Sequence, residues 1–135
     1  MKMKEKHLTN SEEDLMEIFW AKKVPLTSVE ILEISADRSW NGNYLHRMLS
    51  SLLKKGMLEV CGTVQCGTQY ARQFRPAVTK EQYAAEIVMS KGIGIRSLAD
   101  VAVAMVNEAD ESDEEVIKQL EEIIEGLKQK ESKRK

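Results

Sequence analysis

Aromatic residues, prolines and cysteines are scarce in this chain of 135 residues. Phe, Trp and Tyr together make up 5% of it, and it has only two prolines and two cysteines. So few aromatic residues argue against a β-rich sandwich, and low glycine and proline content argues against a low-complexity chain. Two cysteines are too few for a disulfide framework, so free thiols in a reducing compartment are expected. A mainly helical globular protein fits these limits best.

Long apolar runs are also missing. No stretch approaches the roughly 18 consecutive apolar residues that a membrane span needs, and residues 1–6 lead into no apolar signal segment. We therefore expect a cytoplasmic protein that does not insert into membranes.

The sequence shows no constellation of residues for catalysis or metal binding. It offers no nucleophile with a paired base, no phosphate-cradling glycine loop and no cluster of three or more metal ligands, so we predict no catalytic residues, no metal and no cofactor. His46 has no second histidine near it, so a surface or phosphate-contacting role is expected for it. Trp20 and Trp40 end apolar stripes, which favours core positions over a ligand platform.

Charge is plentiful and unevenly divided. Residues 1–77 carry 11 Lys and Arg against 9 Asp and Glu, whereas residues 78–135 carry 9 against 13, which returns the net charge of −2. This weak asymmetry has the sign expected if the N-terminal part meets a polyanion.

Two capping boxes predict the first two helices. Residues 9–12 (Thr-Asn-Ser-Glu) open one helix, which Pro25 should end. Residues 27–30 (Thr-Ser-Val-Glu) open another, which should run to about Asp37 with Val29 on its inner side.

The segment from Asn41 to Lys55 predicts a third helix with one buried stripe. Gly56 follows it, where a helix end favours a left-handed residue. The apolar positions recur at helical spacing: Leu45, Met48, Leu49, Leu52 and Leu53.

A β-hairpin should follow the third helix. Met57–Cys61 and Gln69–Arg75 are short, partly alternating runs, joined by a segment that contains Gly62 and Gly67. Three helices followed by a two-stranded hairpin are the layout of a winged helix-turn-helix, whose third helix enters the DNA major groove.

Polar side chains on the outer side of the third helix are the candidate DNA contacts. Arg47, in the N-terminal half, suits a base edge, and Lys54, near the C-terminal end, suits a phosphate. An ordinary solvated helix face is the alternative. The candidate set is Asn41, Asn43, Tyr44, His46, Arg47, Ser50, Ser51 and Lys54.

Cys61 and Cys66 form a candidate redox pair. If they lie near opposite sides of the hairpin tip, their sulfur atoms come within reach of a disulfide or a shared metal. Incidental free thiols are the alternative interpretation.

The remaining residues should form a helical dimerisation region. A helix from Thr79 to Ser90 leads into two more, the last opened by a third capping box at residues 112–115. Their apolar seam cannot be buried on so small a core without a partner. We expect a DNA-binding domain at 1–77, a dimerisation domain at 78–130 and a disordered basic tail at 131–135. The seam comprises Leu98, Val101, Met105, Ile117, Leu120, Ile124 and Leu127.

An ordered set of residues over nearly the whole chain resembles the penicillinase and methicillin-resistance repressor family, which has a copper-responsive branch. The set includes Leu8-Thr9…Glu12, Ile18-Phe19-Trp20, Trp40, Leu49…Leu52…Lys54-Lys55-Gly56 and Thr79…Glu81-Gln82-Tyr83.

The resemblance implies a homodimeric transcriptional repressor with winged-helix heads and intertwined C-terminal helices, bound to an inverted-repeat DNA operator. It makes a membrane sensor protease, which triggers cleavage of the C-terminal region in several members, a candidate partner. Three departures stand out: Tyr44 and Arg47 replace small hydroxyl residues, the wing from Cys61 to Gln69 is uncharged, and the copper branch's C-terminal cysteine pairs are absent. Because the wing is neutral, a winged-helix protein-interaction module without sequence-specific DNA binding remains the alternative.

Overall fold

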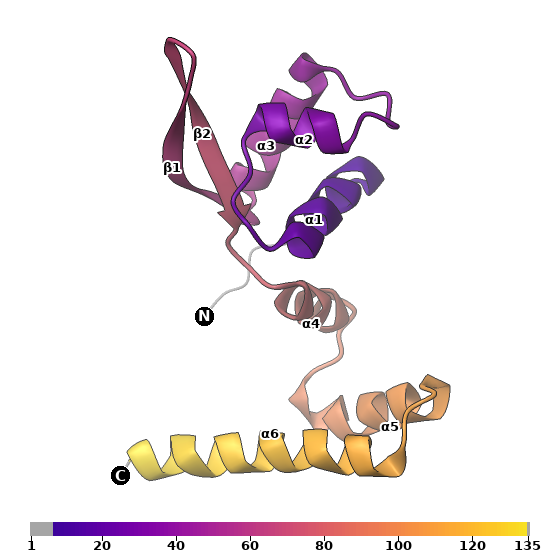
Figure 1. Ribbon diagram of the computed structural model, residues 1–135. Helices are drawn as coiled ribbons and strands as arrows, with labels where there is room; N and C mark the ends of the chain where they lie inside the picture. The colour runs from indigo at the N-terminus through magenta and orange to yellow at the C-terminus, as the bar shows by residue number, and fades with distance from the viewer. Residues whose placement is uncertain (1–6, 135) are drawn as a thin grey trace. The chain divides into compact units, whose positions relative to one another are not determined.

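Three helices and a two-stranded hairpin come first in the described part of the chain, and the elements that follow them are helices and one 3₁₀ turn (Figure 1). The computed structural model describes residues 7–134. The mainly helical fold with a hairpin wing predicted from the sequence is confirmed. In chain order the elements are α1 (Asn10–Lys22), α2 (Ser28–Ile34), α3 (Gly42–Lys54), β1 (Leu58–Cys66), β2 (Gln69–Pro76), α4 (Lys80–Ser90), the 3₁₀ turn η1 (Ile95–Ser97), α5 (Leu98–Glu108) and α6 (Asp113–Lys133).

Helix α1 is capped at both ends. The Thr9 hydroxyl accepts a hydrogen bond from the Glu12 amide (3.2 Å), and the Glu12 carboxylate accepts one from the Thr9 amide (2.9 Å), so the predicted capping box is confirmed. At the other end Lys23 adopts a left-handed backbone conformation (φ 57°), and its amide donates to the Phe19 carbonyl. The helix therefore ends at Lys22, before Pro25 is reached.

Helix α2 is shorter than the sequence predicts. The capping box at 27–30 is present, but the helix ends at Ile34 instead of near Asp37. The Ser35 hydroxyl donates to the Ile31 carbonyl (2.7 Å), which satisfies one of the last helical carbonyl groups from the side chain. The chain then turns towards α3.

The hydrophobic core lies between α1, α2, α3 and the base of the hairpin. The predicted inner position of Val29 is wrong, because its side chain is 52% exposed while Ile31 is fully buried. Helix α2 packs on both α3 and β2, and the side of α2 that faces these two neighbours carries Ile31, which is therefore the buried residue. The predicted stripe of α3 is confirmed by four buried side chains: Leu45, Met48, Leu49 and Leu52.

The hairpin is longer than predicted. Strand β1 continues past Gly62 to Cys66, which pairs with Gln69 in antiparallel register, so only two residues form the turn. Gly67 provides the positive φ (65°) of that turn. Gly62 does not end the strand, because it lies beside a bulge, where a glycine is readily accommodated. At the base, Leu26 and Phe74 form an isolated antiparallel bridge that ties the loop after α1 to β2.

Helix α4 packs against α1. The Trp20 indole N–H donates to the Val78 carbonyl (3.0 Å), and the Trp20 and Tyr83 rings lie 5.8 Å apart. The chain divides into two compact units, and the boundary lies after Gly92. The contacts of Trp20 explain why α4 groups with the N-terminal unit, although the sequence places the domain boundary at residue 77.

The C-terminal unit, from Ile93 onwards, consists of η1, α5 and α6. The Ser112 hydroxyl caps α6 by accepting from the Glu115 amide (3.2 Å), while the Glu115 carboxylate accepts from the Gln119 side chain instead of reaching back. Helix α6 continues to Lys133, so the disordered tail predicted from residue 131 is wrong at its start. No glycine or proline interrupts this last stretch, and Lys and Glu are good helix formers.

Candidate nucleic-acid interface

The side of α3 opposite the core forms a continuous polar surface. Positions three and four residues apart lie on one side of a helix, and here five such positions are all exposed. We call this surface the outer face of α3; its residues are Asn43, His46, Arg47, Ser50 and Lys54. Helix α3 contains no acidic residue, so nothing on the helix offsets its cations. The surface is suited to contact with a polyanion.

Arg47 is held on the outer face by a neighbour one turn away. Its guanidinium carbon lies 5.8 Å from the centroid of the Tyr44 ring, which is a cation–π contact. Tyr44 itself is half-buried and packs against the core. Tyr44 therefore supports Arg47 from the edge of the outer face, and the direct DNA contact predicted for Tyr44 stays a prediction.

Two further predicted contacts have other partners in the structure. The Asn41 side-chain oxygen accepts a hydrogen bond from the Tyr44 amide (2.8 Å) as the cap of α3, which leaves its amide nitrogen available. Ser51 is half-buried, and its hydroxyl is among the groups that lower the pKa of the Glu12 carboxylate on α1. Ser51 thus faces α1 and lies outside the outer face of α3.

The hairpin contributes a cation that the sequence analysis missed. Arg72 on β2 is exposed, and its guanidinium carbon lies 5.5 Å from the centroid of the Phe74 ring. Tyr70, Arg72 and Phe74 share one face of the strand because alternate residues point to the same side. This alternation was the signal in the sequence that could have identified Arg72, because it places Arg72 on the same face of the strand as the apolar Phe74, which is buried in the core. The wing is therefore neutral only at its tip.

Lys55 and Glu12 connect α3 to α1. The Lys55 ammonium lies 2.7 Å from the Glu12 carboxylate, whose side chain is 5% exposed. Burial by itself raises the pKa of Glu12, but hydrogen bonds from Lys55, Ser51 and Thr9 outweigh it and hold the pKa below its ordinary value. Glu12 stays ionised and paired with Lys55, and this ion pair holds the C-terminal end of α3 against α1.

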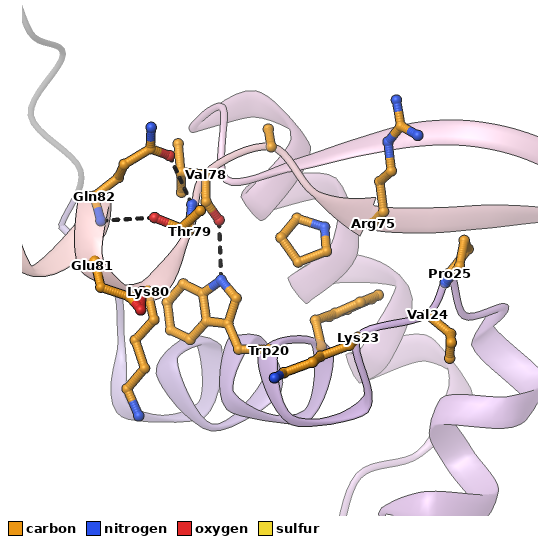
Figure 2. A pocket seen from close by; sticks show the side chains of 13 residues that line it. Trp20, Lys23, Val24, Pro25, Arg75, Val78, Thr79, Lys80, Glu81 and Gln82 are labelled. Carbon is orange, nitrogen blue, oxygen red and sulfur yellow. Dashed lines mark hydrogen bonds between the residues drawn. The ribbon is translucent and has the colours of Figure 1, made fainter. Parts of the chain in front are cut away.

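A pocket of about 660 Å³ lies where the wing leads into α4 (Figure 2). Its lining comes from the end of α1, the end of β2 and the start of α4. The hydrogen bond from the Trp20 indole N–H to the Val78 carbonyl joins two residues of this lining. Thr79 and Gln82, also in the lining, form the reciprocal hydrogen bonds that cap α4. These bonds fix the joint between the wing and α4.

The two cysteines are not placed as a pair. Cys61 and Cys66 lie on the same strand, five residues apart, so the prediction that they face each other across the hairpin tip is wrong. At about 3.3 Å per residue their Cα atoms are roughly 16 Å apart, whereas a disulfide needs less than about 7 Å. Both are free thiols. The longer course of β1 removes the geometric basis of the redox hypothesis.

The predicted dimerisation residues are largely uncovered in the C-terminal unit. No residue of α5 or α6, both described in full, is buried. Val101 is half-buried, whereas the other six side chains of the predicted seam are exposed: Leu98, Met105, Ile117, Leu120, Ile124 and Leu127.

Sites for other ligands are not apparent in the described part of the chain. Residues 7–134 bring together no group of three or more His, Cys, Asp and Glu side chains that could hold a metal ion. Within the same range, no helix is both long and apolar enough to cross a membrane.

Comparison with known proteins agrees with this geometry. The family model for the penicillinase repressor matches residues 8–126, from the residue before the α1 cap to well into α6. No curated protein matches the sequence. The matched family consists of DNA-binding transcriptional repressors and not of enzymes. With most of its length matched and a three-helix-plus-hairpin fold, the chain belongs to the penicillinase repressor family.

Proposed function

We propose that this repressor acts in the cytoplasm as a homodimer, with the α3 helix of each copy in the major groove of one half of an inverted-repeat operator. The observation that carries the proposal is the outer face of α3. All five of its residues are exposed, it includes Arg47 and Lys54, and it lies on a helix without a single acidic residue. A helix of this kind, presented by two other helices and a hairpin, is the recognition element of helix-turn-helix proteins.

The outer face divides into base-reading and phosphate-contacting positions. Arg47, in the N-terminal half of α3, has the forked donors that match guanine O6 and N7, and Asn43 can bond adenine. Lys54, at the C-terminal end, contacts phosphate, which fixes register without reading sequence. Arg72 adds a phosphate contact from the wing. His46 and Ser50 complete the surface, and the Asn41 amide nitrogen reaches the backbone.

The homodimer is supported by the apolar side chains left uncovered on α5 and α6. A two-fold axis relates the two copies, so their α3 helices meet two half-sites in inverted orientation, about one helical turn of DNA apart. Loss of the C-terminal unit would separate the heads and leave each with the affinity for a single half-site. Cleavage triggered by a membrane sensor protease, which the family resemblance implies, would relieve repression in this way.

The test begins with selection of duplexes from a random DNA library by the full-length protein. The selected duplexes should contain an inverted repeat, and a duplex with one half-site should bind much more weakly. Log affinity should fall linearly with log salt, by about 0.9 for each phosphate neutralised. If no DNA is bound even at low salt, the chain is a protein-interaction module and the proposal is wrong.

A further inference from the structure

Helix α6 carries a broad apolar stripe that stays exposed within the part of the chain that the structure describes, residues 7–134. Five large side chains on it are between 44% and 58% exposed. At 100° per residue they fall within an arc of about 120°, which is the width of a helix face normally buried against another helix. The stripe consists of Ile117, Leu120, Ile123, Ile124 and Leu127.

The charges of α6 are separated towards its two ends. Its first turn contains three acidic residues in succession, Asp113 to Glu115. Its last seven residues together with the cap contain four basic side chains, Lys128, Lys130, Lys133 and Arg134, against one acidic side chain, Glu131. One end of α6 is therefore strongly negative and the other positive.

We propose that α6 pairs in antiparallel orientation with the α6 of a second copy of this chain. The inference rests on the proposed homodimer and adds the orientation of its helices. In this arrangement Ile117 meets Leu127 of the second copy and Leu120 meets Ile124 of the second copy, so the pair is centred near Glu122. The stripe would be buried equally well by a parallel pair. The charges therefore decide the orientation.

A parallel pair places the acidic first turns of the two copies side by side. The antiparallel pair instead places each first turn beside the basic end of the other copy, with Glu114 near Lys128 of the second copy. Opposite charges flanking an apolar seam select orientation in paired helices. Two like-charged contacts remain, Glu121 with its own counterpart at the centre and Asp113 with Glu131 of the second copy. Around the second contact, the four basic side chains at the end of α6 outnumber the one acidic side chain, Glu131.

Distance measurement between spin labels distinguishes the orientations. Cys61→Ser and Cys66→Ser remove the native thiols, and Ser132→Cys places a nitroxide on the exposed side of α6. Ser132 lies ten residues from the centre of the pair, so antiparallel packing separates the two labels by about 30 Å along the axis. Parallel packing keeps them about one interhelical spacing apart, roughly 8–10 Å plus the label arms. Gln119→Cys, near the centre, is the control and should give a short distance in either orientation.

The outcomes separate this inference from the proposed function. A dimer with a long Ser132 distance and a short Gln119 distance supports the antiparallel pair. A dimer with a short Ser132 distance overturns the orientation alone, and a dimer with widely separated Gln119 labels overturns the pairing of α6. A protein that sediments as a monomer overturns the homodimer itself.

Charge reversal provides a second readout. Lys128→Glu should weaken dimerisation about fivefold or more, because the two-fold pair loses two attractions, each worth a factor of a few, and repulsion replaces them. Adding Glu114→Lys should restore most of the loss. Lys118→Glu, on the side of α6 away from the stripe, is the matched control and should have little effect. Failure of Glu114→Lys to rescue would overturn the antiparallel contact.

Discussion

The Lys55 ammonium, just past the end of α3, lies 2.7 Å from the Glu12 carboxylate in the first turn of α1, and it also donates to the His7 carbonyl at 2.7 Å. One lysine thus joins α3 both to α1 and to the segment that precedes α1. The same carboxylate closes the capping box of α1. A single acidic side chain therefore serves the start of one helix and the support of another.

This pairing makes stability depend on acidity. The pKa of Glu12 in the folded protein is lower than its ordinary value of 4.5, so the unfolded state binds the proton more readily. The stabilisation is fully present above the unfolded pKa and is lost as pH falls through the folded pKa. Glu12→Gln should reduce the free energy of unfolding at neutral pH by about 1–3 kcal/mol. The free energy of unfolding of this variant should also fall less than that of the wild type as the pH is lowered.

Denaturant unfolding across this pH range measures the effect. Glu13→Gln, in the same turn but exposed, is the matched control and should follow the wild-type curve. If wild type and Glu12→Gln lose stability in parallel as the pH falls, the assignment to Glu12 is wrong.

Trp20→Phe should loosen α4. The substitution removes the hydrogen bond to the Val78 carbonyl, worth about 1 kcal/mol, and reduces the area of the ring contact with Tyr83. Hydrogen exchange should show faster exchange of the α4 amides, with little change in α3. Trp40→Phe removes the other indole, which contacts Arg38 instead, and should leave α4 unaffected. Unchanged protection of α4 in Trp20→Phe would contradict the role given to this bond.

Two truncations should behave differently. A chain ending at Gly92 keeps α4 and should unfold cooperatively as a monomeric head, because the compact unit extends that far. A chain ending at Ala77 loses Val78 and the buried Tyr83, which exposes Trp20. It should have a lower midpoint of thermal unfolding. Equal midpoints would instead support the boundary at residue 77 that the sequence predicts.

Arg47 and Lys54 should affect DNA binding in different ways. Arg47→Ala should relax base preference at one position in each half-site, at a cost of about 1–3 kcal/mol for the preferred base. Lys54→Ala should weaken binding to all sequences alike and reduce the salt slope by about one ion. Lys22→Ala, which removes a lysine from α1, is the control and should change neither quantity.

The measurement is binding of each variant to a panel of operator substitutions at several salt concentrations. If Arg47→Ala weakens every sequence by the same factor, Arg47 contacts the backbone and does not read bases.

The two thiols should react independently. Cys66 is exposed, whereas Cys61 is half-buried and its sulfur lies 3.6 Å from the Gln73 carbonyl oxygen. A thiol reagent should therefore label Cys66 in the native protein well before Cys61. Mass spectrometry of the oxidised native protein should find no intramolecular bond between them. Detection of that bond without unfolding would show that the hairpin rearranges.

The sequence by itself determined the helix starts and the third-helix stripe. The capping boxes at Thr9 and Thr27, the apolar spacing of α3 and the glycine after it all depend on residues within about one or two turns of each other. Interactions of such short range depend only on neighbouring residues, so the local sequence is enough to predict them. The outer face of α3 followed from the same periodicity, because the positions opposite a buried stripe must be exposed.

Tertiary structure alone decided the features that depend on distant partners. Ile31 replaces Val29 in the core because α2 meets both α3 and β2. Ladder pairing carries β1 past Gly62, and that register places both cysteines on one strand. Ser51 and Lys55 face Glu12, across 43 residues in the case of Lys55. These outcomes depend on which surfaces meet after collapse, and no local pattern of caps, periodicity or turn residues records that choice.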